Sequence, residues 1–223
     1  MLLEVSGITK KYSRGNTEFN AVDNASFAVS GGDFTVINGQ SGSGKSTLLA
    51  IAAGLLNPDS GTVVFDGEDL GKLGDTQLSA LRNEKIGFIP QGHCLLDNFT
   101  VFDNVCLPFK LLKRSGDPGE LAAKLLEQVG VTQLSKQFPP ELSGGEIRRA
   151  AIARGLINSP KLLIADEPTG DLDPDNAANI MRLFREIAES GTAVLVVTHE
   201  REKPAGTSSR LIMNNGVLFP EAA

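Results

Sequence analysis

The chain has 223 residues, 41% hydrophobic and 22% charged, which suits one α/β domain with a sizeable core. Its formal net charge of −6 argues against a dedicated nucleic-acid-binding protein, because phosphate contacts need a basic surface. No apolar stretch is long enough to cross a bilayer and the N-terminus lacks a signal-peptide pattern, so we expect a chain that is neither secreted nor a membrane span. Cys94 and Cys106 are too far apart for a C-x-x-C site, which favours two reduced thiols.

Short strands dominate the first third of the chain. Runs of β-branched and aromatic residues, separated by Gly, Asp, Asn and Ser, predict them. The expected strands are Leu2–Val5, Ala25–Val29, Thr35–Ile37, Thr62–Phe65 and, ended by Pro90, Lys85–Pro90.

Residues 39–46, Gly-Gln-Ser-Gly-Ser-Gly-Lys-Ser, fit the phosphate-binding pattern G-x-x-x-x-G-K-[ST]. An apolar strand precedes them, and Thr47–Ala53 reads as the first turns of a helix, which is the context that the motif requires. The glycines permit backbone angles that turn successive N–H groups toward one anion. Lys45 would add its charge on the β- and γ-phosphates, and the Ser46 hydroxyl would bind Mg²⁺. The motif predicts a nucleoside triphosphate site formed by Gly39, Gln40, Ser41, Gly42, Ser43, Gly44, Lys45, Ser46 and Thr47.

Helical spacing replaces the strand pattern from Val101 to Ile157, with apolar residues such as Leu125 and Val129 on one face. Strand character returns at Leu162–Ala165 and Ala193–Val197. Continuous apolar runs like these suit strands that are buried on both faces of a mostly parallel sheet. We expect one domain over 1–223, with a core at about 1–90 and 160–223 and a helical subdomain at about 92–158.

Two carboxylates end the apolar strand at Leu162–Ala165. Asp166 can hold Mg²⁺ opposite Ser46, and Glu167 would then face the γ-phosphate and polarise the attacking water. A solvated strand end would explain the two acids as well if they stood alone. The phosphate loop favours the catalytic interpretation, because phosphoryl transfer needs a metal site and a positioned nucleophile.

Leu142-Ser-Gly-Gly-Glu146 opens a helix that runs to about Ile157. Ser143 and Glu146 stand in the S-x-x-E relation of a capping box. Gly144 and Gly145 weaken the first turn of such a helix, which makes sense if a ligand must approach its backbone closely. The exposed amides of this helix start would form a second anion site.

Together these features resemble the nucleotide-binding subunit of an ATP-binding cassette (ABC) transporter, over nearly the whole chain from Leu3 to Leu218. The resemblance implies a P-loop NTPase of the ABC ATPase type. Such a fold has a mostly parallel core sheet, an N-terminal antiparallel β subdomain and an inserted α-helical subdomain. ATP and Mg²⁺ are the implied cofactors.

The resemblance also assigns roles to single residues. Tyr12 stands where the family stacks an aromatic ring on adenine, and Gln91 matches the Q-loop glutamine that touches Mg²⁺. Asp173 matches the D-loop aspartate, and His199 matches the switch histidine on the γ-phosphate. A surface aromatic at Tyr12 and a structural histidine at His199 are the alternatives. The family signature corresponds to Ser143, Gly144, Gly145 and Glu146, with Glu146 where the commonest form has glutamine.

In this family two subunits dimerise head to tail on ATP, so we expect a homodimer in which the phosphate loop of one copy faces the signature helix of the other. The implied partner is an integral membrane permease, contacted through the region between Gln91 and Arg114. The chain would be cytoplasmic and peripheral on the inner face of the cell membrane.

Within the family, the sequences of the motifs are most similar to those of the branch typified by LolD, MacB and FtsE, which pulls mechanically on lipoproteins, peptides or drugs. The chain departs from the usual sequence of that branch at three places, which are Gly92, Asp171 and the helix-breaking Lys203–Gly206. The alternative is a soluble ABC ATPase without a membrane partner, such as an iron–sulfur cluster assembly type.

Overall fold

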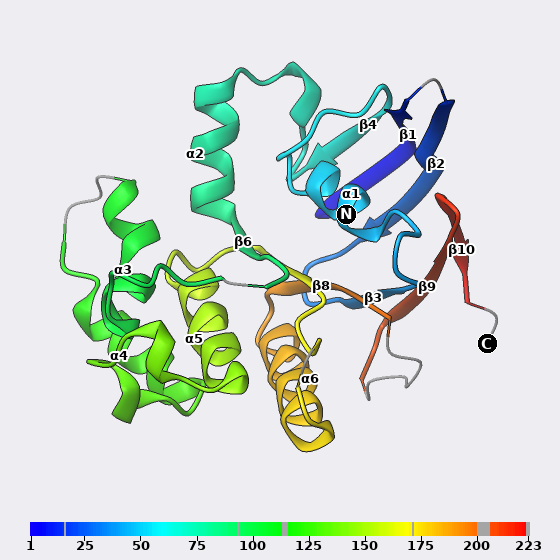
Figure 1. Cartoon of the computed structure of the whole chain (residues 1–223). Coiled ribbons are helices and arrows are strands. Elements are labelled where there is room, and N and C mark those ends of the chain that lie inside the picture. Colours follow the sequence, from blue (N-terminus) through cyan, green and yellow to red (C-terminus); the bar gives the residue numbers. More distant parts are fainter. Residues whose placement is uncertain (16, 93, 113–115, 171, 200–205, 222–223) are drawn as a thin grey trace.

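Two β-sheets organise the computed structural model, which describes residues 1–15, 17–92, 94–112, 116–170, 172–199 and 206–221 (Figure 1). In this part of the chain an antiparallel sheet has the strand order β2-β1-β4-β5, and a core sheet has the order β10-β9-β3-β8-β7-β6. The core sheet is parallel from β9 to β6, and only β10 runs antiparallel to its neighbour. These sheets confirm the fold class that the sequence indicated.

The antiparallel sheet contains longer strands than the sequence predicted. Its strands are β1 (Leu3–Arg14), β2 (Thr17–Val29), β4 (Ser60–Phe65) and β5 (Glu68–Asp69). Only the inner halves of β1 and β2 carry the apolar pattern, since their outer halves are polar and largely exposed. The outer halves are strands because they pair with each other as far as Arg14 and Thr17, which local composition does not reveal.

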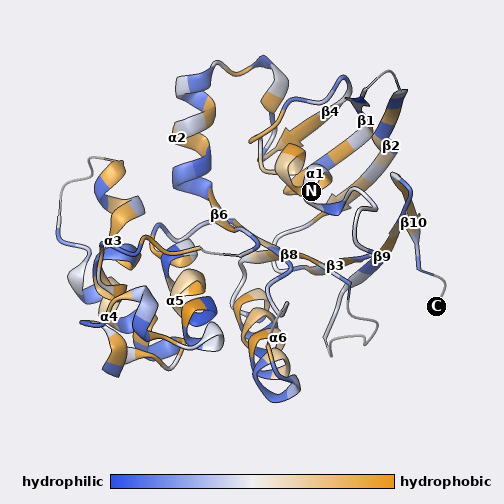
Figure 2. Cartoon of the chain, viewed as in Figure 1, coloured by the Kyte–Doolittle hydropathy of each residue, from blue (hydrophilic) through white to orange (hydrophobic). Residues whose placement is uncertain are grey.

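The core sheet is buried on both faces, as its continuous apolar runs predicted. Its strands are β3 (Phe34–Asn38), β6 (Ile86–Ile89), β7 (Leu162–Asp166), β8 (Ala193–Thr198), β9 (Ser209–Asn214) and β10 (Val217–Pro220). Alternate residues of one strand enter different cores: Leu163 joins one hydrophobic cluster, whereas Leu162 and Ile164 join another. Figure 2 shows the hydrophobic colouring along these central strands.

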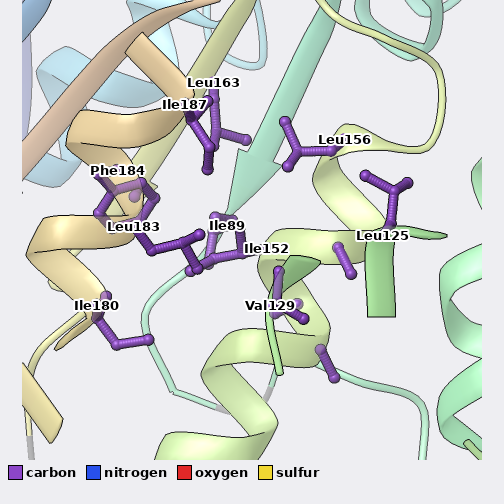
Figure 3. Close-up of a cluster of buried hydrophobic side chains, with 14 of the residues drawn as sticks. Ile89, Leu125, Val129, Ile152, Leu156, Leu163, Ile180, Leu183, Phe184 and Ile187 are labelled. Atoms are coloured by element: carbon purple, nitrogen blue, oxygen red, sulfur yellow. The ribbon is translucent and has the colours of Figure 1, made fainter. Parts of the chain in front are cut away.

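Helices cover both faces of the core sheet. They are α1 (Lys45–Ala52), α2 (Asp75–Lys85), α3 (Val101–Leu111), α4 (Gly119–Gln128), α5 (Gly144–Leu156) and α6 (Pro174–Glu189), with 3₁₀ turns at Leu70–Lys72, Thr132–Leu134 and Pro139–Glu141. α1 contributes to the same core as the antiparallel sheet. On the other face, Ile152 of α5, Phe184 of α6 and Leu163 of β7 belong to one hydrophobic cluster, part of which Figure 3 shows. Helices α3, α4 and α5 gather at one side of the molecule (Figure 1).

Helix α2 and the hairpin of β9 and β10 were not predicted. α2 buries only Leu78 and Leu81, so its apolar pattern is too sparse to recognise. The predicted helical region does contain α3, α4 and α5, but 3₁₀ turns interrupt it before α5. Cys94 and Cys106 are free thiols, and both are buried. No helix among the described residues is long and apolar enough to span a bilayer. Residues 203–205, part of the departure noted after His199, lie outside the described residues, as does Asp171.

Candidate functional site

The phosphate-binding motif forms a tight turn from β3 into the start of α1. Gly39 N donates to Thr198 O at 3.2 Å, and Ser43 N donates to Gln40 O at 3.1 Å. Gly44 caps α1 with φ 104°, where a Cβ atom would lie 2.0 Å from the Ala21 carbonyl oxygen. Only glycine fits there, and the turn directs the helix N-terminus and its free amides at the space above the loop.

Lys45 is buried within this loop, with 5% of its surface exposed. Its ammonium donates to the carbonyl oxygens of Gly39 at 2.8 Å and Gln40 at 3.0 Å. It also forms an ion pair with Glu167, with Nζ 3.2 Å from Oε1. The loop therefore holds one positive charge at a fixed place beside a carboxylate.

Glu167 is oriented from both sides. Its backbone has φ 49°, in the left-handed region that few non-glycine residues adopt, and its N–H donates to Val197 O at 3.0 Å. Its Oε2 lies 2.7 Å from His199 Nδ1 and accepts the His199 backbone N–H at 3.2 Å. Because Glu167 is buried, these contacts fix the direction of its carboxylate toward the phosphate loop.

Asp166 and Ser46 lie side by side at the carboxyl end of β7. Ser46 Oγ donates to Asp166 Oδ1 at 3.2 Å. Burial raises the pKa of Asp166, and the neighbouring Glu167 carboxylate adds to this, whereas the Ser46 hydrogen bond and the charges of Lys45 and Arg148 oppose it. A buried carboxylate beside a hydroxyl oxygen is a donor set that suits Mg²⁺.

A groove of about 580 Å³ lies above these residues. Its lining includes Lys45, Ser46 and Glu167, together with Tyr12 and Gln91. The structure therefore brings most of the predicted site residues together. Five further residues line the groove that were not predicted: Phe19, Asn20, Ala21, Asn215 and Gly216.

Tyr12 and Phe19 form an aromatic pair on the groove. They face each other across β1 and β2, with ring centroids 6.3 Å apart and planes inclined by 37°. Both side chains are exposed, at 42% and 49%. Exposed aromatic faces on a groove suit a flat ligand group such as a nucleobase.

The signature residues and Asp173 are placed elsewhere, since neither set appears in the described lining of the groove. Ser143 caps α5 and forms the predicted capping box, in which its N–H and hydroxyl both donate to Glu146 Oε2, at 2.8 and 2.7 Å. These bonds lower the pKa of Glu146. Ser143 and Gly144 are exposed, whereas Gly145 is buried next to Asn176. Within the described part of one chain, this helix start does not line the groove that holds the phosphate loop.

Asp173 caps the other helix that starts near this point, α6. Its Oδ1 accepts from Asn176 N at 3.0 Å and its Oδ2 accepts from Asn176 Nδ2 at 2.6 Å. These hydrogen bonds lower the pKa of Asp173. Asn176 therefore contacts both Asp173 and Gly145, so the two predicted segments lie next to each other.

One family model and several solved structures are similar to this chain. The family model described as ABC transporter matches residues 22–170. The dimeric ATP-binding cassette MJ0796, in a post-hydrolysis state bound to ADP and Pi, is similar with a TM-score of 0.90 and 32% identity, covering 99% of each chain. A second dimeric structure of MJ0796, a bacterial ABC transporter cassette, has a TM-score of 0.89 and 34% identity, covering 97% of this chain and 96% of that one. The protein cbiO1 from Clostridium perfringens, part of the complex cbiONQ, has a TM-score of 0.84 and 29% identity, covering 98% and 86%.

Proposed function

We propose a function from the premise that this chain belongs to the ABC transporter family, as one of its ATP-hydrolysing cassettes. It would be a motor subunit that closes as a head-to-tail homodimer on ATP and drives an integral membrane permease. One observation supports the dimer: among the described residues of one chain, the exposed start of α5 does not line the phosphate groove. Each would then be one half of a site. Each would complete the other across a two-fold axis.

ATP would lie along the groove with its base at Tyr12 and Phe19 and its phosphates over the loop before α1. Lys45 would then exchange the carbonyl oxygens that it contacts in this structure for the β- and γ-phosphates. The amides at the start of α1 would bind the same phosphates, because they are oriented by the turn at Gly44.

Ser46, Asp166 and Gln91 would hold the Mg²⁺ that accompanies ATP. The three residues offer a hydroxyl, a carboxylate and an amide oxygen, which fits a hard cation. The ion neutralises phosphate charge when bound. Ser46 and Asp166 are already in hydrogen-bonding contact, so little rearrangement is needed for both to share one ligand.

Glu167 would accept the proton of the attacking water. Its Oε2 is hydrogen-bonded to His199, and this contact holds the carboxylate in one direction. The far edge of the imidazole would then be left for the γ-phosphate. The His199 side chain is 58% exposed, so it would remain accessible to a bound nucleotide or a partner copy.

The start of α5 would contribute from the second copy. Ser143 and the amides of Gly144 and Gly145 would bind the γ-phosphate of ATP held in the partner's groove. Asp173, which lies next to this segment through Asn176, would meet the partner's phosphate loop. ATP would thus join the two copies, and its hydrolysis at Glu167 would release them.

The membrane partner is supported by the family and by the resemblance to the LolD, MacB and FtsE branch. It would place the chain on the cytoplasmic face of the cell membrane as a peripheral subunit. Isolation of the tagged Glu167→Gln chain with ATP from detergent-solubilised native membranes tests this. We expect one integral membrane protein to co-purify in a constant ratio, and less of it with ADP. A constant soluble partner and no membrane protein would contradict the proposal and favour the soluble ABC ATPase.

A further inference from the structure

Arg148 connects the signature helix to the loop that carries Gln91. It lies on α5 five residues after Ser143 and is 7% exposed. Its Nη1 donates to the carbonyl oxygen of Pro90 at 3.0 Å and to Cys94 Sγ at 3.4 Å. The Cys94 thiol in turn donates to the Gly92 carbonyl oxygen at 3.2 Å. The guanidinium therefore holds both ends of a short segment with Gln91 inside it.

Stability alone does not explain a charge at this place. Both hydrogen-bond acceptors of Arg148 are uncharged, although its charge also acts on Asp166 and opposes the rise in the pKa of that carboxyl. A guanidinium that leaves water for a carbonyl and a thiol regains only part of its hydration energy. An apolar side chain of similar length would fill the same space at less cost in desolvation. What Arg148 adds is a directional link between two segments 58 residues apart.

The two residues beside Gln91 differ in conformational freedom. Pro90 before it has a fixed φ, whereas Gly92 after it has φ 80° and open space within 4 Å of where a Cβ would lie. Further along, α5 touches β6 directly, because a Cβ on Gly87 would lie 2.4 Å from the Gly155 carbonyl oxygen. The helix is thus joined to this strand and its following loop at two levels, one of them through Arg148.

We propose that Arg148 is a positioning residue that makes the backbone at Gln91 and the signature helix move as one unit; this rests on the proposed function of Gln91 and Ser143. A shift of Gln91 toward a bound metal and phosphate either breaks the bond at Pro90 or pulls α5 with it. Because Ser143 stands at the start of α5, occupancy of one groove is passed to the helix that completes the other groove. Arg148 itself is outside the described lining of the groove, so it would touch neither ATP nor metal.

The test is a double-mutant cycle on steady-state ATP hydrolysis with Arg148→Met and Gln91→Ala. We expect Arg148→Met to lower kcat about tenfold, within the range known for residues that couple sites. Binding of a fluorescent ATP analogue to the monomer should change by less than about twofold, because the groove is untouched. In the Gln91→Ala background the same change should have almost no further effect, because Arg148 acts through Gln91.

Two further variants keep the result interpretable. Arg148→Lys retains one donor for Pro90 and should recover most of the activity, whereas Arg148→Gln should recover part of it if Arg148→Met folds poorly. Equal losses in both backgrounds, or wild-type kcat in Arg148→Met, would overturn the positioning role while leaving the proposed function intact. A Gln91→Ala chain with unchanged kcat would instead remove Gln91 from the site, and this inference with it.

Discussion

The imidazole of His199 and the carboxylate of Glu167 are joined twice, through Nδ1 at 2.7 Å and through the His199 backbone N–H at 3.2 Å. The backbone contact remains in any His199 variant, so substitution separates the role of the ring from the placement of Glu167. We predict that His199→Ala lowers kcat about 100-fold, as for loss of a group that assists proton transfer. ATP affinity should be nearly unchanged.

His199→Asn is the matched variant, because its amide nitrogen is attached to Cγ as Nδ1 is and can donate to Glu167 in its place. Single-turnover hydrolysis with radiolabelled ATP gives the rate of the chemical step. A fully active His199→Ala chain would show that the histidine is structural, the alternative that the sequence left open.

Removing the charge of Asp166 should make the folded protein more stable near neutral pH. Its pKa is raised in the folded chain, mainly by burial, above the ordinary value of 3.8. The folded state therefore binds the proton more tightly, and the free energy of unfolding falls as pH rises from about 4 through the folded pKa. Asp166→Asn keeps an oxygen that accepts from Ser46 but carries no charge.

Urea unfolding of Asp166→Asn at several pH values measures this. The variant and the wild-type chain should differ least below pH 4 and most near pH 7, where the variant is the more stable. Its hydrolysis of MgATP should be lost. A destabilised variant at pH 7 would contradict the account of the Asp166 pKa.

The aromatic pair should contribute to nucleotide affinity and not to phosphate affinity. We predict that Phe19→Ala weakens ATP binding about tenfold, as for loss of one base-stacking contact, and that Tyr12→Ala does the same. Calorimetry with ATP and with inorganic tripolyphosphate separates the two, since only ATP carries a base. Leu111→Ala, at a residue 66% exposed and outside the described groove, is the control. Equal losses for both ligands would contradict a base contact.

Two loop glycines should respond differently to alanine. At Gly44 the added Cβ would lie 2.0 Å from the Ala21 carbonyl oxygen, so the loop or β2 must move. At Gly42 no atom lies within 4 Å, and only the positive φ of 78° is strained. We predict that Gly42→Ala loses about 1 kcal/mol of stability and still binds ATP, whereas Gly44→Ala loses binding. Thermal unfolding with and without ATP measures both, and identical behaviour would contradict the close approach at Gly44.

Much of the fold could be predicted because its signals are local. The phosphate loop, the buried strands and the capping box at Ser143 each lie within a few neighbouring residues. The hairpin at Asn215-Gly216 also has a local signal that the predicted strands did not include, since Asn-Gly is a favoured two-residue turn. That turn places Asn215 on the groove.

Other parts of the site depend on contacts between distant segments. Phe19 is an ordinary strand residue until the pairing of β1 with β2 sets it opposite Tyr12. Arg148 reads as part of an exposed helix start until α5 packs beside the Pro90 loop. Register and packing create these contacts, and neither can be obtained from one sequence by periodicity.

The claim that the groove is completed by a second copy can be tested by light scattering after size-exclusion chromatography in ATP. The Glu167→Gln chain should run as a dimer of the 23.6 kDa subunit with ATP and as a monomer with ADP, because it binds ATP without hydrolysing it. Adding Ser143→Arg should abolish the dimer while each monomer still binds ATP, whereas Gln133→Arg, an equal charge on an exposed residue of the same helical region, should not. A Glu167→Gln chain that stays monomeric in ATP, or a Glu167→Gln, Ser143→Arg chain that still dimerises, would contradict the composite site.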